Sequence, residues 1–252
     1  MPDCLLTDRR GAVLVATLNR PAKRNALSCE LLIALRDLVR SMLADAAVEA
    51  MVITGAPPAF SSGLDLAEIA TAHGDQPAGN AFADATYDAL DAIYRSPKPI
   101  IAAVNGVSAA GGAGLMTVCD VAVAARSAQI GYPEIKRGLT AAIVMPFLIR
   151  QVGERRAKWL LLSGEMIDAD HALSIGLIDE VVGDAAVVDH AVALARQLAS
   201  LPPSSYADTK RILHEILSLP AGADLEHCRA VHSQMLISGH GQRFLKQFLE
   251  KR

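Results

Sequence analysis

The sequence predicts an α/β fold, and two observations carry that prediction. A buried strand, a loop of small residues, a helix and a further strand follow one another twice, first from position 50 and again from position 97. The 252 residues are 52% hydrophobic but only 4% aromatic, so the core is built from aliphatic side chains. A chain of this length suits one large domain, or one domain with an appendage.

The N-terminal part predicts a strand and then a capped helix. Residues 11–21, GAVLVATLNRP, read as a strand that ends in a turn. Ser28 is a suitable N-cap for the helix that follows. Apolar residues recur along that helix at helical spacing, namely Leu31, Leu35, Leu38 and Met42.

Further strands are predicted in the middle of the chain. Residues 50–55 and 97–106 contain short apolar runs, and the stretch CDVAVAA that begins at Cys119 is another. The polar stretch within residues 71–80 contains Gly and Pro, so it is interpreted as a surface loop. A helix is expected over residues 82–94.

Beyond Arg155 the chain is mostly helical, with one short strand expected at residues 178–182. The expected helices cover about 155–163, 168–175, 185–199, 204–218 and 224–249. Pro202 and Pro203 mark a boundary between two of them. We therefore divide the chain into a core of residues 1–200 and a helical C-terminal region of residues 201–252.

Charge and cysteine usage narrow the function classes. The formal net charge is -3 and the isoelectric point is about 6.2, which predicts neither a nucleic-acid nor an anionic-membrane partner. The 4 cysteines form no C-x-x-C pair and are typical of reduced thiols. The N-terminus lacks a signal-peptide pattern, and no apolar run approaches about 18 residues. These features predict a cytoplasmic protein.

Two glycine-bearing loops are the candidate functional elements. PPAFSSGLDLAEI covers residues 57–69, NGVSAAGGAGLMTVCD covers residues 105–120, and each follows a buried strand and opens a helix. The first N–H groups of a helix have no partner within it, so two such loops could aim two donors at one oxygen, as an oxyanion hole does. Close helix–strand packing also selects Gly and Ala, and the spacing alone leaves both interpretations open.

Other kinds of site fit less well. A G-x-G-x-x-G dinucleotide loop and a G-K-[ST] phosphate loop are both absent. Ser61, Ser62 and Ser108 lie in the two loops, but no G-x-S-x-G motif or nearby histidine would activate them. His227 and His232 are five residues apart, which is poor spacing for ligands on one helix face.

Glu134 is the carboxylate whose surroundings are unusual. It follows Pro133 in AQIGYPEIKRGL, between glycines and apolar residues. An apolar setting raises a carboxyl pKa and suits the group to proton transfer. A surface glutamate at a turn is the alternative that the sequence leaves open.

Taken in order, these segments resemble the crotonase superfamily, the enoyl-CoA hydratase/isomerase group, over nearly the whole chain. The resemblance rests on LNRPAKRNAL, AFSSGLDLAEI, NGVSAAGGAGLMTVCDVAVAA, PEIKRGL, ALSIGLIDEVV and the terminal FLEKR. It implies a spiral of β-β-α units, with a C-terminal helical region that serves trimerisation, and an assembly as a homotrimer or hexamer.

The resemblance also implies a role for the two loops. They would hold the thioester oxygen of an acyl-CoA between the backbone N–H groups of Leu64 and Gly111, with Glu134 as the catalytic residue. No metal or redox cofactor is implied, because CoA enters as part of the substrate. The residues at the positions that hold CoA in the family are Ala22, Lys23, Arg24, Ala26, Ser62, Asp65, Leu66 and Phe248.

One departure from the family pattern decides between reactions. Hydratases of the family carry two glutamates, and the first of these positions is Gly114 here, while the second is Glu134. A single carboxylate can still move a proton from C2 to C4 of a 3-enoyl-CoA, so a Δ3,Δ2-enoyl-CoA isomerase is favoured. The stretch LTAAIVMPFLIRQVG after Gly138 also departs from the hydratase glycine-proline turn.

The alternatives belong to several classes. A 2-enoyl-CoA hydratase would need its second acid elsewhere, for example at Asp65 or Glu68. A catalytically weak acyl-CoA-binding protein would keep the loops but lose the turnover. A hydrolase on the same architecture would use Ser62 or Ser108. Acyl chain length, branching and pathway are left open by the sequence.

Overall fold

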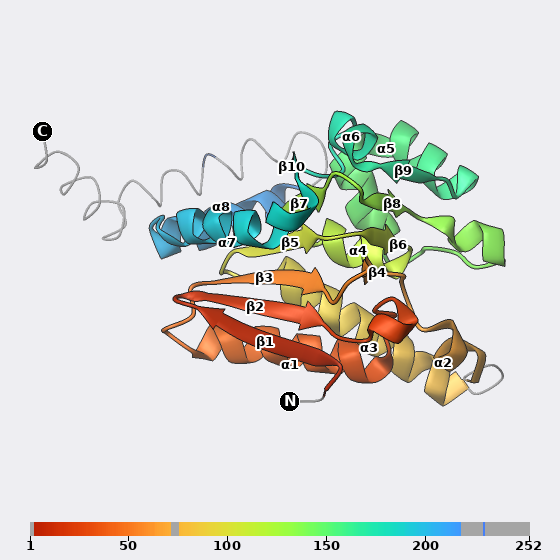
Figure 1. Cartoon of the computed structure of the whole chain (residues 1–252), viewed down its shortest axis with the longest axis horizontal. Coiled ribbons are helices and arrows are strands. Elements are labelled where there is room, and N and C mark those ends of the chain that lie inside the picture. Colours follow the sequence, from red (N-terminus) through yellow and green to blue (C-terminus); the bar gives the residue numbers. More distant parts are fainter. Residues whose placement is uncertain (1–2, 72–75, 218–228, 230–252) are drawn as a thin grey trace, which may run out of the picture. The chain divides into compact units, whose positions relative to one another are not determined.

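Two β-sheets organise the structure, a computed structural model that describes residues 3–71, 76–217 and 229 (Figure 1). The larger sheet has the strand order β1-β2-β3-β5-β7-β10 and the smaller has β4-β6-β8-β9. The chain divides into two compact units, residues 1–200 and residues 201–252, and both sheets belong to the first. The α/β class is thereby confirmed.

The larger sheet begins with an antiparallel hairpin and continues in parallel. Its strands are β1 (Leu5–Arg10), β2 (Val13–Leu18), β3 (Ala50–Gly55), β5 (Ile100–Val104), β7 (Val121–Ala125) and β10 (Glu180–Val182). Strands β3 and β5 are buried along their whole length, as continuous apolar strands of a parallel sheet are. Helix α7 (Val187–Ala199) packs against β3, β5 and β7.

The smaller sheet is what makes the fold a spiral. Its strands are β4 (Ala59–Ser61), β6 (Val107–Ala109), β8 (Gln129–Gly131) and β9 (Met166–Asp168). Each of β3, β5 and β7 is followed by one short strand of this sheet, β4, β6 or β8, and then by a helical segment. The β-β-α unit expected from the resemblance is therefore confirmed. Strands β4, β6 and β8 run parallel, so their C-terminal ends lie at one edge.

Helices fill the connections of the first unit. Ser28 is confirmed as the N-cap of α1 (Cys29–Ala44), since its Oγ accepts the Leu31 N–H at 3.2 Å. The other helical segments are η1 (Pro21–Lys23), α2 (Leu66–Thr71), α3 (Gln76–Tyr94), α4 (Gly111–Thr117), η2 (Pro133–Arg137), α5 (Met145–Ser163), α6 (Ala169–Ser174) and η3 (Asp184–Ala186), where η denotes a 3-10 turn.

One element boundary predicted from the sequence is wrong, and one helix is longer than expected. The surface loop placed at residues 71–80 becomes helix from Gln76 onward, because Pro77 lies in the first turn of α3, where its missing N–H costs no hydrogen bond. The helix expected at about residues 155–163 is confirmed as the second part of α5. Gly153, with φ 77° and ψ 161°, separates it from a first part that begins at Met145 and was not predicted.

The second unit is described by its first helix, α8 (Pro203–Ile216), which matches the helix expected at residues 204–218. The helix expected at residues 224–249, with Phe248 in it, lies outside the described residues. Among the described helices, none combines the length and the apolar character that a bilayer crossing requires.

Candidate active site

The candidate site lies where three neighbouring strands end. Leu64 follows β4, Gly111 follows β6, and Glu134 follows β8. Because β4, β6 and β8 are adjacent and parallel, their C-terminal ends meet at one edge, which is where ligands bind in open α/β sheets. Residues that are 70 positions apart in the sequence, counted from Leu64 to Glu134, thereby face one cavity.

The two loops are in contact because glycines, which have no side chain, occupy the positions where they meet. Gly63 has φ 97°, and a Cβ on it would lie 2.7 Å from the Ala110 Cβ and 3.1 Å from the Gly111 nitrogen. A Cβ on Gly112 would lie 2.5 Å from the Ser61 carbonyl oxygen. The 2.7 Å and 2.5 Å distances are shorter than real Cβ atoms reach, so these positions require Gly. Close packing of the loops is therefore a real feature of the structure.

The same packing brings two unpaired N–H groups together. A Cβ on Gly111 would lie 3.3 Å from the Leu64 nitrogen. Within the described part of the chain, neither the Leu64 N–H nor the Gly111 N–H has an acceptor. Leu64 forms an isolated bridge with Leu27, but its neighbours Gly63 and Asp65 make the hydrogen bonds there. Gly111 is the first residue of α4, outside the helical ladder.

Ala110 holds a strained backbone beside these donors. Its φ of 54° and ψ of -128° lie where residues with a side chain rarely occur, and such conformations cost about 1–3 kcal/mol. The Ala110 N–H donates to the Gly131 carbonyl oxygen at 2.8 Å, which anchors the residue to β8. The sheet therefore fixes the direction of the next N–H, that of Gly111.

Glu134 faces the cavity from the 3-10 turn η2. Its Oε2 is buried and has no hydrogen-bond partner among the described residues. Burial raises the pKa of Glu134 above its ordinary value, and its own backbone N–H and the Arg137 guanidinium offset only part of that shift. A raised pKa suits a carboxyl group to take a proton and then return it. The alternative of a simple surface glutamate does not fit this burial.

The cavity has a volume of about 470 Å³, within the range of small-molecule sites. It brings together most of the positions that the resemblance singled out, namely Lys23, Ala26, Ser62, Leu64, Asp65, Leu66, Gly111 and Glu134. Ala22 and Arg24 are exposed on or beside η1 and do not line it. Sequence reasoning did not name the remaining lining residues, which are Ala67, Ile69, Ala110, Arg137, Leu139, Thr140, Ala141, Ile143 and Val144.

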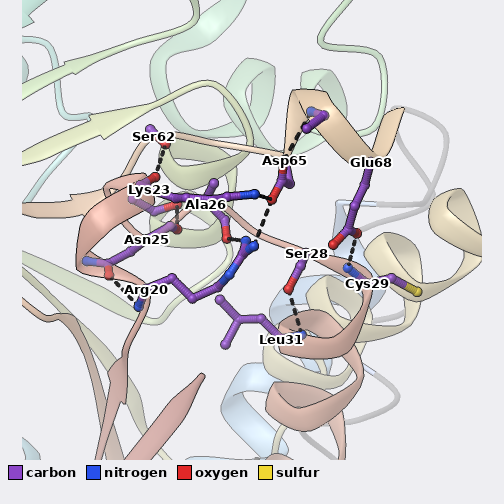
Figure 2. A network of polar contacts seen from close by, with 12 residues as sticks. Arg20, Lys23, Asn25, Ala26, Ser28, Cys29, Leu31, Ser62, Asp65 and Glu68 are labelled. Atoms are coloured by element: carbon purple, nitrogen blue, oxygen red, sulfur yellow. Dashed lines mark hydrogen bonds and ion pairs between the residues drawn. The ribbon is translucent and has the colours of Figure 1, made fainter. Parts of the chain in front are cut away.

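A polar network fixes the first loop against residues 20–28 (Figure 2). The Asp65 carboxylate is only 4% exposed and accepts hydrogen bonds from Arg20 Nη2 at 2.8 Å and Lys23 Nζ at 3.3 Å. Burial alone would raise the pKa of Asp65, but the hydrogen bonds from Arg20 and Lys23 outweigh it and lower that pKa. Asp65 therefore stays ionised and is unsuited to replace the missing second acid.

The Glu68 carboxylate is also engaged in a hydrogen bond, so it is not a free acid in the site. Its Oε2 accepts the Cys29 N–H at 2.8 Å, at the start of α1. Asn25 adds a further connection, because its Nδ2 donates to the carbonyl oxygens of Ala56 and Ala59. Arg20 and Asn25 both lie in the LNRPAKRNAL segment, so the signal for this network was present in the sequence but was assigned only to CoA contacts.

The loop serines lack a base. Ser61 Oγ donates to the Asn25 carbonyl oxygen, and Ser62 Oγ donates to the Lys23 carbonyl oxygen. Ser108 Oγ is buried without a hydrogen-bond partner among the described residues. Of the described residues that line the cavity, none is a histidine. The arrangement therefore gives no support to the serine-hydrolase alternative.

The paired sheets and the two-loop site define a protein of the crotonase fold. A crystal structure of an enoyl-CoA hydratase from Mycobacterium smegmatis matches with a TM-score of 0.89 at 31% identity, covering 99% of this chain and 97% of that one. The family model described as enoyl-CoA hydratase/isomerase matches residues 8–252. The chain belongs to the enoyl-CoA hydratase/isomerase family, a family of enzymes.

Two relatives illustrate the range of the family. A Thermus thermophilus protein, provisionally named an enoyl-CoA hydratase, is 37% identical over 249 residues, with 96% of each chain covered. The 2,3-dehydroadipyl-CoA hydratase of Escherichia coli is 32% identical over 249 residues, covering 98% of this chain and 96% of that one.

Gly112→Ala should lower the free energy of unfolding by about 1–3 kcal/mol, because the added methyl group would overlap the rigid Ser61 backbone. Gly183→Ala is the matched control, since a Cβ there meets nothing within 4 Å, and it should change the value by less than about 0.5 kcal/mol. Urea unfolding followed by circular dichroism measures both. Equal stability of the two variants would contradict the close contact of the loops.

Glu134→Gln should make the protein more stable than wild type at neutral pH, but not in acid. Because the folded-state pKa of Glu134 is raised, the folded protein binds more protons than the unfolded chain above about pH 4, and wild-type stability falls as pH rises through that window. The Gln variant lacks this loss. Unfolding free energies at pH 4 and pH 8 test the difference, which should be absent at the lower pH.

Glu154→Gln is the control for that experiment. Hydrogen bonding to Lys158 lowers the pKa of Glu154, so any effect of its removal has the opposite sign. A Glu134→Gln variant that is less stable than wild type at pH 8 would mean that the carboxylate is satisfied rather than strained.

Proposed function

We propose that this protein is a Δ3,Δ2-enoyl-CoA isomerase that works with one carboxylate. The observation that carries the proposal is the set of acidic residues that line the cavity. Among the described lining residues the acids are Asp65 and Glu134, and Asp65 is held in ion pairs. Of these two acids, Glu134 is the one with a raised pKa and a buried oxygen that has no partner among the described residues.

The reaction follows from the positions of three groups. The thioester oxygen of a 3-enoyl-CoA would accept the N–H groups of Leu64 and Gly111. The Glu134 carboxylate would remove a proton from C2, and the electron pair of that C–H bond would move into an enolate conjugated with the C3–C4 double bond. Return of the proton to C4 would leave the double bond between C2 and C3. General acid–base transfer of this kind contributes about 10²- to 10⁴-fold.

Val144 accounts for the missing second carboxylate. A Cβ on Gly114 would overlap the Val144 Cγ1, so the side chain of Val144 fills the volume that a residue at 114 would need. Val144 is 1% exposed and lines the cavity. Hydration requires a water molecule held by polar partners, and a valine methyl supplies none. An apolar wall at this point favours double-bond migration over addition of water.

Matched thioesters test the proposal. Purified protein with hex-3-enoyl-CoA should form hex-2-enoyl-CoA without accumulating a 3-hydroxy product, as chromatography would show. Glu134→Gln keeps the size of the side chain and removes the base, so kcat should fall by about 10²- to 10⁴-fold while binding of the thioester persists. Full activity of this variant would remove Glu134 from the mechanism.

A second test introduces a carboxylate at position 114, where hydratases of the family carry their first glutamate. Gly114→Glu alone should destabilise the protein, since the new side chain overlaps Val144. Gly114→Glu combined with Val144→Ala should restore stability and give measurable conversion of hex-2-enoyl-CoA to its 3-hydroxyacyl product. A single Gly114→Glu variant as stable as wild type would show that Val144 does not fill this place.

The hydratase function is the second candidate, because relatives such as those of Escherichia coli and Thermus thermophilus carry hydratase names. Rapid formation of 3-hydroxyacyl-CoA by the wild-type protein would establish it. Binding of CoA thioesters without any turnover would instead support the acyl-CoA-binding protein. The homotrimer or hexamer, the CoA contact of Phe248 and the cytoplasmic location stay predictions.

A further inference from the structure

Arg137 is a cavity cation that the proposed reaction does not use. The charged residues that line the cavity are Lys23, Asp65, Glu134 and Arg137. Lys23 is paired with Asp65. Across residues 3–71 and 76–217, no acceptor or acid pairs with the Arg137 guanidinium, while its neighbour Lys136 is paired with Glu165 at 2.8 Å. The cavity thus has one cation that makes no ion pair with a described acid.

The geometry of η2 places this cation near Glu134. Glu134 and Arg137 are three residues apart on a 3-10 turn, so they lie on one face, separated by about 6 Å along the axis. Both line the cavity. The positive charge of Arg137 acts on the Glu134 carboxyl, which agrees with this placement.

The wall that continues from Arg137 is mainly apolar. Leu139, Ala141, Ile143 and Val144 line it, with Thr140 among them. An acyl chain lying along this wall past Glu134 would meet aliphatic side chains and a single guanidinium. A guanidinium binds carboxylates through two parallel N–H donors, and it is poorly matched to a purely hydrocarbon chain.

We propose that Arg137 binds a carboxylate carried by the acyl chain, so that the substrates are CoA thioesters of short dicarboxylic 3-enoic acids. This inference rests on the proposed isomerase function. The phosphates of CoA are the other possible anions. The pantetheine arm separates them from the thioester, whereas Arg137 lies one 3-10 turn from the group that acts on the acyl carbons.

Two thioesters that differ at one end test the inference. Hex-3-enoyl-CoA ends in a methyl group where the mono-CoA thioester of hex-3-enedioic acid carries a carboxylate. The wild-type enzyme should prefer the dicarboxylic substrate in kcat/KM. Arg137→Gln should lower the ratio of the two kcat/KM values by about 10- to 100-fold, and Arg137→Lys should restore part of it.

Lys136→Gln is the matched control, because it removes the adjacent cation, which does not line the cavity. That variant should leave the substrate ratio unchanged. Inhibition by free CoA distinguishes the two sources of anion, and it should be equal in wild type and Arg137→Gln.

Four results would overturn the inference. An equal loss on both substrates would mean that Arg137 acts only through Glu134. Weaker inhibition by free CoA in Arg137→Gln, with an unchanged substrate ratio, would assign Arg137 to a phosphate. Wild-type turnover of hex-3-enoyl-CoA without a preference for the dicarboxylic thioester would refute this inference and leave the isomerase standing. Turnover of neither thioester would refute both this inference and the proposed isomerase function.

Discussion

The contact between residues 61–64 and residues 109–112 is the constraint on which the site depends. Gly63 and Gly112 permit it, because a Cβ at either position would penetrate the opposite loop. The contact places the N–H groups of Leu64 and Gly111 side by side. Ala110 has a strained backbone conformation there, with a positive φ. Strain at this point is consistent with preorganised donors, which do not have to reorient as negative charge develops on an oxygen.

The polar network around Asp65 keeps the first loop in that position. Arg20 and Lys23 hold its carboxylate (Figure 2). The buried Asn25 connects the same turn to Ala59 in β4. Loss of Asp65 would leave the largely buried Arg20 guanidinium without its carboxylate partner. Asp65 is thus explained as a support for the loop that bears Leu64, and its ionised state follows from that role.

The sequence predicted the long elements better than the site. Strands β3 and β5 are continuous apolar runs, and Ser28 is a strong cap, so local patterns suffice for both. The strands that position the site are only 3 residues long in β4, β6 and β8, too short to give a period. The convergence of Glu134 with the two loops therefore came from the family resemblance. The overlap of Val144 with position 114 depends on packing between α4 and α5, which no local pattern encodes.

Glu134 shows how the cavity balances two opposing demands. Burial disfavours its ionised form and so costs stability, yet a base must be ionised to remove a proton from carbon. A carboxyl whose pKa is raised toward the working pH can act as base and then as acid within one turnover. The charge of Arg137 limits how far the pKa rises, and a substrate carboxylate bound to Arg137 would weaken that effect. Substrate binding and the basicity of Glu134 are then coupled through one guanidinium, so that binding the proposed substrate would itself make the proton shuttle a stronger base.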